Sequence, residues 1–132
     1  MTREDKDLLL EDLCGRLPYG VKVQVDLQSD TYSPIVCKVC SVECAEIGST
    51  FIGVEVSPDT YNEFREFLCK PYLFPRSSMT EEEKSQYSFF LTRIIDGYDA
   101  SLLIDWLNAH HFDYRGLIGK GLAIDATDKN IY

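Results

Sequence analysis

The side chains that could do chemistry are densest between Asp105 and Arg115. This stretch contains both histidines and the single tryptophan of the chain, together with two aspartates and an arginine. A histidine oriented by Asp105 or Asp113 could act as a general acid or base, and two histidines with a carboxylate could bind a metal ion. We therefore define a candidate interaction or site patch that consists of Trp106, His110, His111, Asp113, Tyr114 and Arg115.

The spacing within this patch is specific neither for catalysis nor for metal binding. Adjacent residues on a helix diverge by about 100°, so His110 and His111 could face one metal only if the helix ends there. A structural interpretation fits the same residues, with Trp106 and His110 four positions apart on the core and the imidazole hydrogen-bonded. Aromatic and arginine side chains are also common anchors of protein interfaces. We therefore favour a structural or partner-contacting patch, and assign no catalytic, cofactor-binding or metal-binding residue.

Cysteines provide the second candidate for chemistry. Cys37, Cys40 and Cys44 are closely spaced, and paired thiolates can bind zinc or an iron–sulfur cluster. In a strand, however, Cys40 and Cys44 share one face while Cys37 points to the other, and Lys38 and Val39 do not favour a turn. The five cysteines of the chain are an odd number, which favours reduced thiols over a disulfide framework. We expect small buried thiols and no cofactor.

Other catalytic signatures are absent from the sequence. Gly116, Gly119 and Gly121 have neither the Walker spacing nor the dinucleotide-binding fingerprint, and no nucleophile elbow occurs. Ser77, Ser78 and Thr80 are better explained by helix capping than by nucleophilic catalysis. The motifs therefore favour a protein that is not an enzyme.

The elements that must position the patch begin with a helix and three strands. Thr2 can cap a helix whose apolar residues recur at three- and four-residue spacings. Residues 21–27 alternate apolar and polar, which is typical of a half-buried strand. Residues 35–42 are almost wholly apolar, which predicts a central strand covered on both faces, and residues 51–56 predict a third strand. Short connections between these strands indicate an antiparallel meander over residues 21–56.

Residues 58–126 are predicted to be mainly helical. Ser57 and Pro58 are typical of a helix start, and Pro71 would end that helix. Thr80 and Glu83 then form a capping box for a helix over about 81–95. A further helix is expected from about residue 101, with a short edge strand at 122–124 and a frayed end at 127–132.

These elements predict one α+β domain over residues 1–132. We expect a small antiparallel sheet of three to four strands with about four packed helices, and residues 21–56 could form an SH3-like or partly closed barrel. A chain of 132 residues that is 45% apolar is large enough to bury one core.

Charge and hydropathy restrict the partners of this domain. The formal net charge of -9 repels phosphate, so direct nucleic-acid binding is not expected. No apolar run has the roughly 20 residues of a membrane helix, and the charged amino terminus does not resemble a signal peptide. We therefore expect a cytoplasmic protein that does not bind membranes.

Two segments resemble a known group of sequences. Residues 70–83 read KPYLFPRSSMTEEE and residues 105–118 read DWLNAHHFDYRGLI. Both are similar to segments of small uncharacterised proteins encoded by bacteriophages, prophages and mobile elements of gut anaerobic bacteria, with the similarity carried mainly by residues 70–126. No activity is implied by this resemblance. It implies a bacterial or phage setting, in which small acidic accessory proteins often bind host or phage proteins.

Three functions follow as hypotheses, and the first is favoured. It is a non-enzymatic accessory or interaction protein of phage or mobile-element type that binds a host or phage protein. The alternative is a small hydrolase or metal-dependent enzyme that uses His110, His111 and Asp113. The third is an acidic inhibitor that mimics nucleic acid and blocks a basic protein surface. The sequence leaves the partner and the oligomeric state open.

Overall fold

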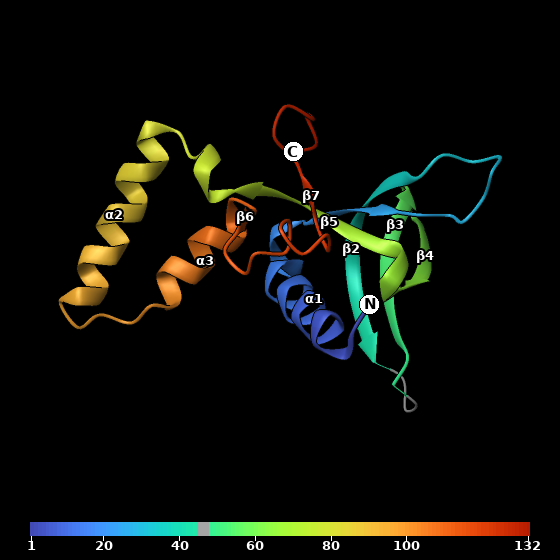
Figure 1. The fold of residues 1–132 in the computed structure, drawn as a ribbon, viewed down its shortest axis with the longest axis horizontal. Coiled ribbons are helices and arrows are strands. Elements are labelled where there is room, and N and C mark those ends of the chain that lie inside the picture. The colour runs from blue at the N-terminus through green and yellow to red at the C-terminus, as the bar shows by residue number, and fades with distance from the viewer. Residues whose placement is uncertain (45–47) are drawn as a thin grey trace.

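In the part of the chain that the structure describes, the fold combines a mixed β-sheet with three α-helices. It was obtained as a computed structural model and describes residues 1–44 and 48–132. The sheet and α1 form one body, while α2 and α3 form a helical hairpin that projects to one side of it (Figure 1). The helices of the described residues are α1 (Arg3–Arg16), α2 (Glu81–Ile95) and α3 (Ser101–Ala109), with short 3-10 turns at Leu17–Tyr19, Glu66–Leu68 and Arg76–Ser78.

Among the described residues the sheet contains seven strands, six of them in the order β4-β3-β2-β1-β5-β6, and β7 also pairs with β5. The first five strands pair antiparallel, whereas β6 and β7 run parallel to β5. Strand β1 lies between β2 and β5, with Val23 opposite both Cys37 and Pro71. The strands are β1 (Lys22–Val25), β2 (Ile35–Cys44), β3 (Thr50–Ser57), β4 (Thr60–Arg65), β5 (Cys69–Pro75), β6 (Phe112–Asp113) and β7 (Ile124–Asp125).

The predicted sheet of three to four antiparallel strands with about four helices is therefore wrong, although the α+β class is confirmed. The prediction of an SH3-like or partly closed barrel over residues 21–56 is also wrong, because the sheet includes strands up to residue 125. Strand β6 was not predicted, and the predicted edge strand at 122–124 overlaps β7 only at Ile124; both strands have two residues and show no sequence periodicity. Such short strands are defined by their pairing with β5, which a local pattern cannot reveal.

The helix expected after Ser57 and Pro58 does not form. Asp59 adopts a left-handed conformation with φ of 61°, and the chain turns back as β4, which pairs antiparallel with β3. In this β3–β4 pair, Phe64 lies opposite Ile52 and packs against the core. Pairing with the edge of β3 outweighs the local helix signal, because a strand satisfies its backbone groups there at once. The mainly helical part therefore begins at Glu81 rather than at residue 58.

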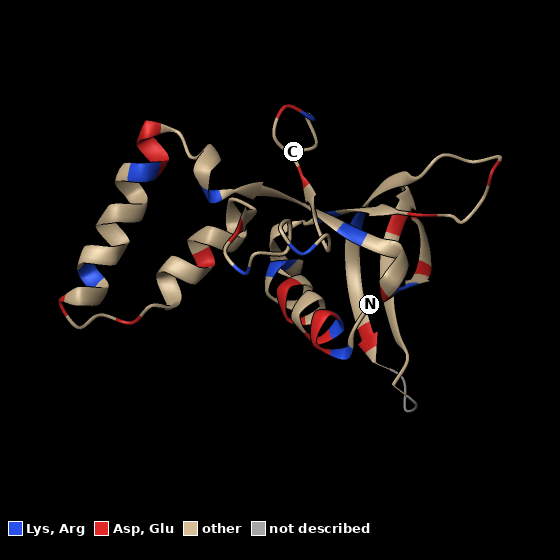
Figure 2. Cartoon of the chain, viewed as in Figure 1, with Lys and Arg blue, Asp and Glu red and all other residues tan. Residues whose placement is uncertain are grey.

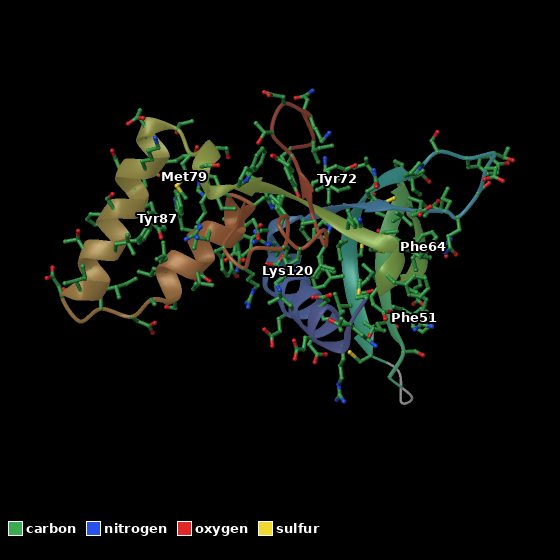
Figure 3. All side chains as sticks on the ribbon, in the orientation of Figure 1. Phe51, Phe64, Tyr72, Met79, Tyr87 and Lys120 are labelled. Atoms are coloured by element: carbon green, nitrogen blue, oxygen red, sulfur yellow. The ribbon has the colours of Figure 1, made fainter. Side chains whose placement is uncertain are left out.

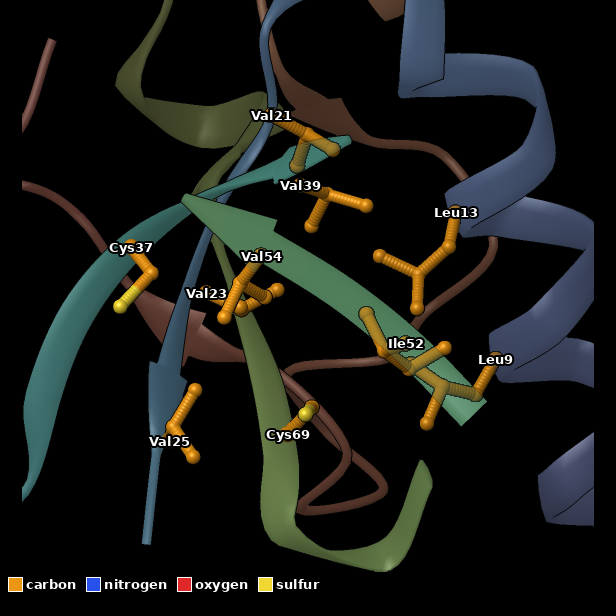
Figure 4. Packing of buried hydrophobic residues seen from close by; sticks show 10 residues of the cluster. All are labelled: Leu9, Leu13, Val21, Val23, Val25, Cys37, Val39, Ile52, Val54 and Cys69. Atoms are coloured by element: carbon orange, nitrogen blue, oxygen red, sulfur yellow. The ribbon is translucent and has the colours of Figure 1, made fainter. Parts of the chain in front are cut away.

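The main core lies between α1 and the sheet. Leu9 and Leu13 are fully buried against Val23, Ile52 and Val54 (Figure 4). The predicted cap of α1 is confirmed, since the Thr2 side chain accepts a hydrogen bond from the Asp5 amide at 3.0 Å.

Strand β2 is covered on one face only, which corrects the expectation that both faces are buried. Its residues alternate, with Cys37 and Val39 buried and Val36 and Lys38 exposed. An antiparallel sheet of this kind packs one face on the core and leaves the other to solvent. Apolar composition alone could not show this, because Val36 is apolar and nevertheless 48% exposed.

The two helices of the α2–α3 hairpin form where the sequence predicts them. The capping box is confirmed, with the Glu83 amide donating to the Thr80 hydroxyl at 3.2 Å and the Thr80 amide donating to the Glu83 carboxylate at 2.9 Å. Tyr87 points from α2 toward α3 (Figure 3) and lies 6.4 Å from Trp106, measured between ring centroids. No helix of the described residues is long and apolar enough to cross a membrane.

Candidate functional site

The predicted patch is divided at His111. Helix α3 ends at Ala109, and His111 adopts a left-handed conformation with φ of 59°, which turns the chain into β6. Histidine is one of the few residues other than glycine that adopts this conformation at moderate cost. As a result, Trp106 and His110 lie on the hairpin, whereas the residues from His111 to Arg115 lie at its junction with the sheet.

Most of the junction residues stabilise the local fold. The Asp113 carboxylate accepts hydrogen bonds from the Leu117 amide at 2.9 Å and the Ile118 amide at 3.0 Å. The Tyr114 hydroxyl donates to the side chain of Asn108 at 2.8 Å. Asp113 is therefore a capping residue for the turn that follows it, and Tyr114 closes the end of α3.

A buried ion pair on α1 completes this junction. Arg16 Nε donates to Asp12 Oδ2 at 2.8 Å, and both side chains are fully buried. Arg16 also donates to the Phe112 carbonyl and lies 5.1 Å from the Tyr114 ring. Burial raises the pKa of the Asp12 carboxyl against the opposing effect of Arg16. The pair therefore joins the body to the chain segment that leaves the hairpin.

Sequence reasoning missed Asp12 and Arg16. The signal was present, because these residues are four apart and occupy the same side of α1 as the buried Leu9 and Leu13. Arg115, which the patch included, approaches the same carboxylate, with Nε 3.5 Å from Asp12 Oδ1. It also bonds Glu11 at 3.3 Å on the surface.

His111 is buried, and it packs against Tyr132 near the carboxy-terminal end of the chain. Its ring stacks on Tyr132 at 3.7 Å between centroids, and burial lowers its pKa to about 4. The Tyr132 hydroxyl donates to the Tyr72 carbonyl at 2.8 Å and accepts from the Lys22 amide at 3.0 Å. The expectation that residues 127–132 fray is therefore wrong for Tyr132.

The structure does not bring His110, His111 and Asp113 to one point. His110 Nδ1 lies 2.9 Å from the Trp106 carbonyl, while His111 and Asp113 have the separate partners described above. Within residues 1–44 and 48–132, no three histidine, cysteine or acidic side chains are placed to hold a metal ion. The expectation of buried thiols is confirmed for Cys37 and wrong for Cys40 and Cys44, which are exposed.

The remaining patch residues line an apolar groove on the hairpin, which we call the hairpin groove. Its volume is about 590 Å³, and it is lined by Ser85, Gln86, Phe89, Phe90, Trp106 and His110. The Trp106 indole donates to the Gln86 side chain at 3.0 Å, and its ring lies tilted against the His110 ring with centroids 4.5 Å apart. The groove therefore has an ordered aromatic floor with few polar groups, which suits an apolar side chain better than a charged substrate.

The apolar surface of the hairpin continues beyond this groove. No residue of α2 is buried, even though its sequence contains six aromatic or large aliphatic residues. The large apolar residues exposed on the hairpin are Phe89 (58%), Leu91 (38%), Ile95 (84%), Tyr98 (59%), Leu102 (59%) and Ile104 (38%). These exposed apolar side chains lie on more than one side of the two helices, and they make the hairpin a candidate interaction surface.

A larger hollow of about 750 Å³ lies beside the start of α1. Lys6 forms an ion pair there with Glu66 at 3.5 Å. The lining of this hollow includes Cys44 and Gly48, which flank residues 45–47 in the sequence, and those three residues are outside the described part of the chain, so we assign no site to it. The hairpin groove is the candidate functional site.

Comparisons with known proteins add no evidence to this assignment, which depends on the geometry of the groove. The chain matches no protein-family model, no curated protein and no solved structure.

Proposed function

We propose that this protein is a non-enzymatic accessory protein of phage or mobile-element type, which acts in the cytoplasm by binding a host or phage protein through the α2–α3 hairpin. The observation that carries the proposal is the exposure of this hairpin. Helix α2 buries no residue, while Phe89 and Leu102 are each more than half exposed. A bound protein would cover these side chains and gain about 25 cal/mol for each Å² of apolar surface removed from water.

Enzymatic chemistry receives less support from the geometry. An acid–base or metal mechanism would need His110, His111 and Asp113 to converge, and these residues have separate structural partners. The groove that contains His110 is lined mainly by aromatic side chains. Binding is therefore the function that the described side chains suit best.

Matched pull-downs from bacterial lysate test the proposal. The parent protein is compared with Leu102→Ser, which changes the hairpin, and with Val36→Ser, which changes an exposed apolar residue of the sheet at 48% exposure. We expect the same proteins to be captured by the parent and by Val36→Ser and to be lost with Leu102→Ser. Capture that is unchanged by Leu102→Ser and reduced by Val36→Ser would move the binding surface to the sheet and contradict the proposal.

A further inference from the structure

We infer that the hairpin groove binds a basic amphipathic helix of the partner protein. This inference rests on the proposed function and specifies the chemistry of the partner. Two features of the hairpin carry it, the position of the apolar side chains around each helix and the sign of the surrounding charges.

The apolar side chains on the groove side form an elongated surface. Phe89 and Phe90 come from α2, with ring centroids 5.9 Å apart, and Trp106 comes from α3 at 6.0 Å from Phe90. Leu102 is four residues before Trp106, so it extends the groove surface by about one helical turn. An amphipathic helix recognises such a surface with apolar residues spaced at three, four and seven positions.

The charges around this surface are predominantly acidic. Residues 81–109 contain six carboxylates and two basic side chains, a net charge of -4. Figure 2 shows acidic residues at the start of α2, in the connection to α3 and on α3 itself.

Both basic side chains of the hairpin already have partners within it. Lys84 pairs with Glu81 at 3.2 Å, and the Arg93 guanidinium lies over the rings of Phe89 and Tyr98 at 5.4 and 4.3 Å. Among the described residues, no ion pair involves Glu82 or Asp105. The carboxylates of Glu82 and Asp105 are therefore open to a basic partner.

The same charges argue against a second copy of this chain as the occupant. Glu81, Glu82 and Glu83 lie at one end of the hairpin, and Asp96 and Asp99 lie at the other. An antiparallel pair of hairpins would place the glutamates of one copy beside the aspartates of the other, and a parallel pair would place glutamates beside glutamates. Like charges brought together across an interface cost several kcal/mol. Lysine and arginine on a partner helix would instead be attracted at both ends.

Peptide binding tests the inference directly. The probe is a synthetic 18-residue helix with a leucine stripe and lysine flanks, and its control carries glutamate in place of lysine. Trp106 reports binding because it is the single tryptophan and lines the groove. We expect saturable change in its fluorescence with the lysine peptide, at least tenfold weaker binding of the glutamate peptide, and loss of affinity as salt screens the charges.

Two matched variants locate the bound peptide. Phe89→Ser should weaken binding at least tenfold, because Phe89 lines the groove. Ile95→Ser should leave affinity within twofold, because Ile95 lies about 120° away around the same helix. Both side chains are exposed, so circular dichroism should show each variant folded. The double variant Glu82→Gln with Asp105→Asn should weaken binding at least threefold and reduce its salt dependence.

Three results would overturn the inference. Equal binding of the lysine and glutamate peptides would remove the charge requirement. Weaker binding with Ile95→Ser than with Phe89→Ser would place the peptide on the other side of α2. Sedimentation that shows a dimer, lost in Phe89→Ser, would make a second copy the occupant. The pull-down with Leu102→Ser is independent of all three, so the proposed function can stand when this inference fails.

Discussion

The helices of the body and of the hairpin differ in how completely their apolar residues are covered. In the body, α1 places Leu9 and Leu13 at zero exposure against the sheet. In the hairpin, Tyr87, Phe90 and Ile94 of α2 are only partly buried against a small core that includes Leu103 and Leu107, and Phe89 is 58% exposed. An apolar stripe on a helix therefore predicts a surface that is buried by packing. The tertiary structure determines whether residues of the same chain bury it.

The body buries charged residues, whereas the hairpin exposes apolar ones. The body buries Asp12 and Arg16 completely, while the hairpin leaves Phe89 and Leu102 in solvent. The buried charges are located where α1 meets the segment that follows α3, so they fix the position at which the hairpin leaves the body. This arrangement suits a protein whose body is a rigid support and whose hairpin is the contact surface.

The strongest test of this contrast is Arg16→Ala. We expect it to lower the free energy of unfolding by about 3–5 kcal/mol, because the buried Asp12 carboxyl loses its hydrogen-bonded cation and keeps only Arg115, whose Nε is 3.5 Å away. The Phe112 carbonyl also loses the hydrogen bond from Arg16. Urea denaturation followed by circular dichroism measures the change.

A double variant provides the control for this change. Asp12→Leu combined with Arg16→Met replaces the pair by apolar side chains and should lose less stability than Arg16→Ala alone. A loss below about 1 kcal/mol for Arg16→Ala, within the range of an ordinary surface substitution, would show that the pair does not hold the junction.

Identical substitutions in the two regions sharpen the comparison. Leu13→Ala should cost about 2–5 kcal/mol, because Leu13 is fully buried in the core between α1 and the sheet. Leu102→Ala should cost about 0.5 kcal/mol or less, because Leu102 is 59% exposed. Thermal melting of the two variants beside the parent provides the measurement. Equal losses would mean that the hairpin surface is covered in the isolated protein and would remove the distinction between the regions.

The elements with strong local signals could be predicted from sequence. Thr2, Thr80 and Glu83 mark helix starts by their own hydrogen bonds, and the periodicity of residues 51–56 indicates a strand. Residues 60–65 could not be assigned in this way, because Tyr61 and Phe64 fit a helical stripe as well as a strand. Their strand conformation depends on pairing with β3.

The candidate site was predictable in part for the same reason. Trp106 was correctly placed on a helix, whereas His110 lies just after the helix end, and the division of the patch at His111 depends on one left-handed residue. Gln86 and Phe89 complete the groove from a helix some twenty residues earlier, and a single chain segment cannot show that proximity. The ion pair of Asp12 and Arg16 was missed because charged residues are seldom fully buried.

A pH dependence of stability is also expected at the junction. Burial lowers the pKa of His111 to about 4, with smaller contributions from the positive charge of Arg16, His110 and Lys22, whereas a histidine in the unfolded chain titrates near 6.5. Between these values the unfolded chain binds the additional proton, so stability should decrease as pH falls from about 6.5 to 4, by at most about 3 kcal/mol. Denaturation at several pH values measures this slope. His111→Asn is the matched control, because asparagine tolerates the left-handed backbone and does not titrate. The variant should lose less stability than the parent between pH 6.5 and 4, and parallel curves would show that the His111 ring does not titrate with unfolding.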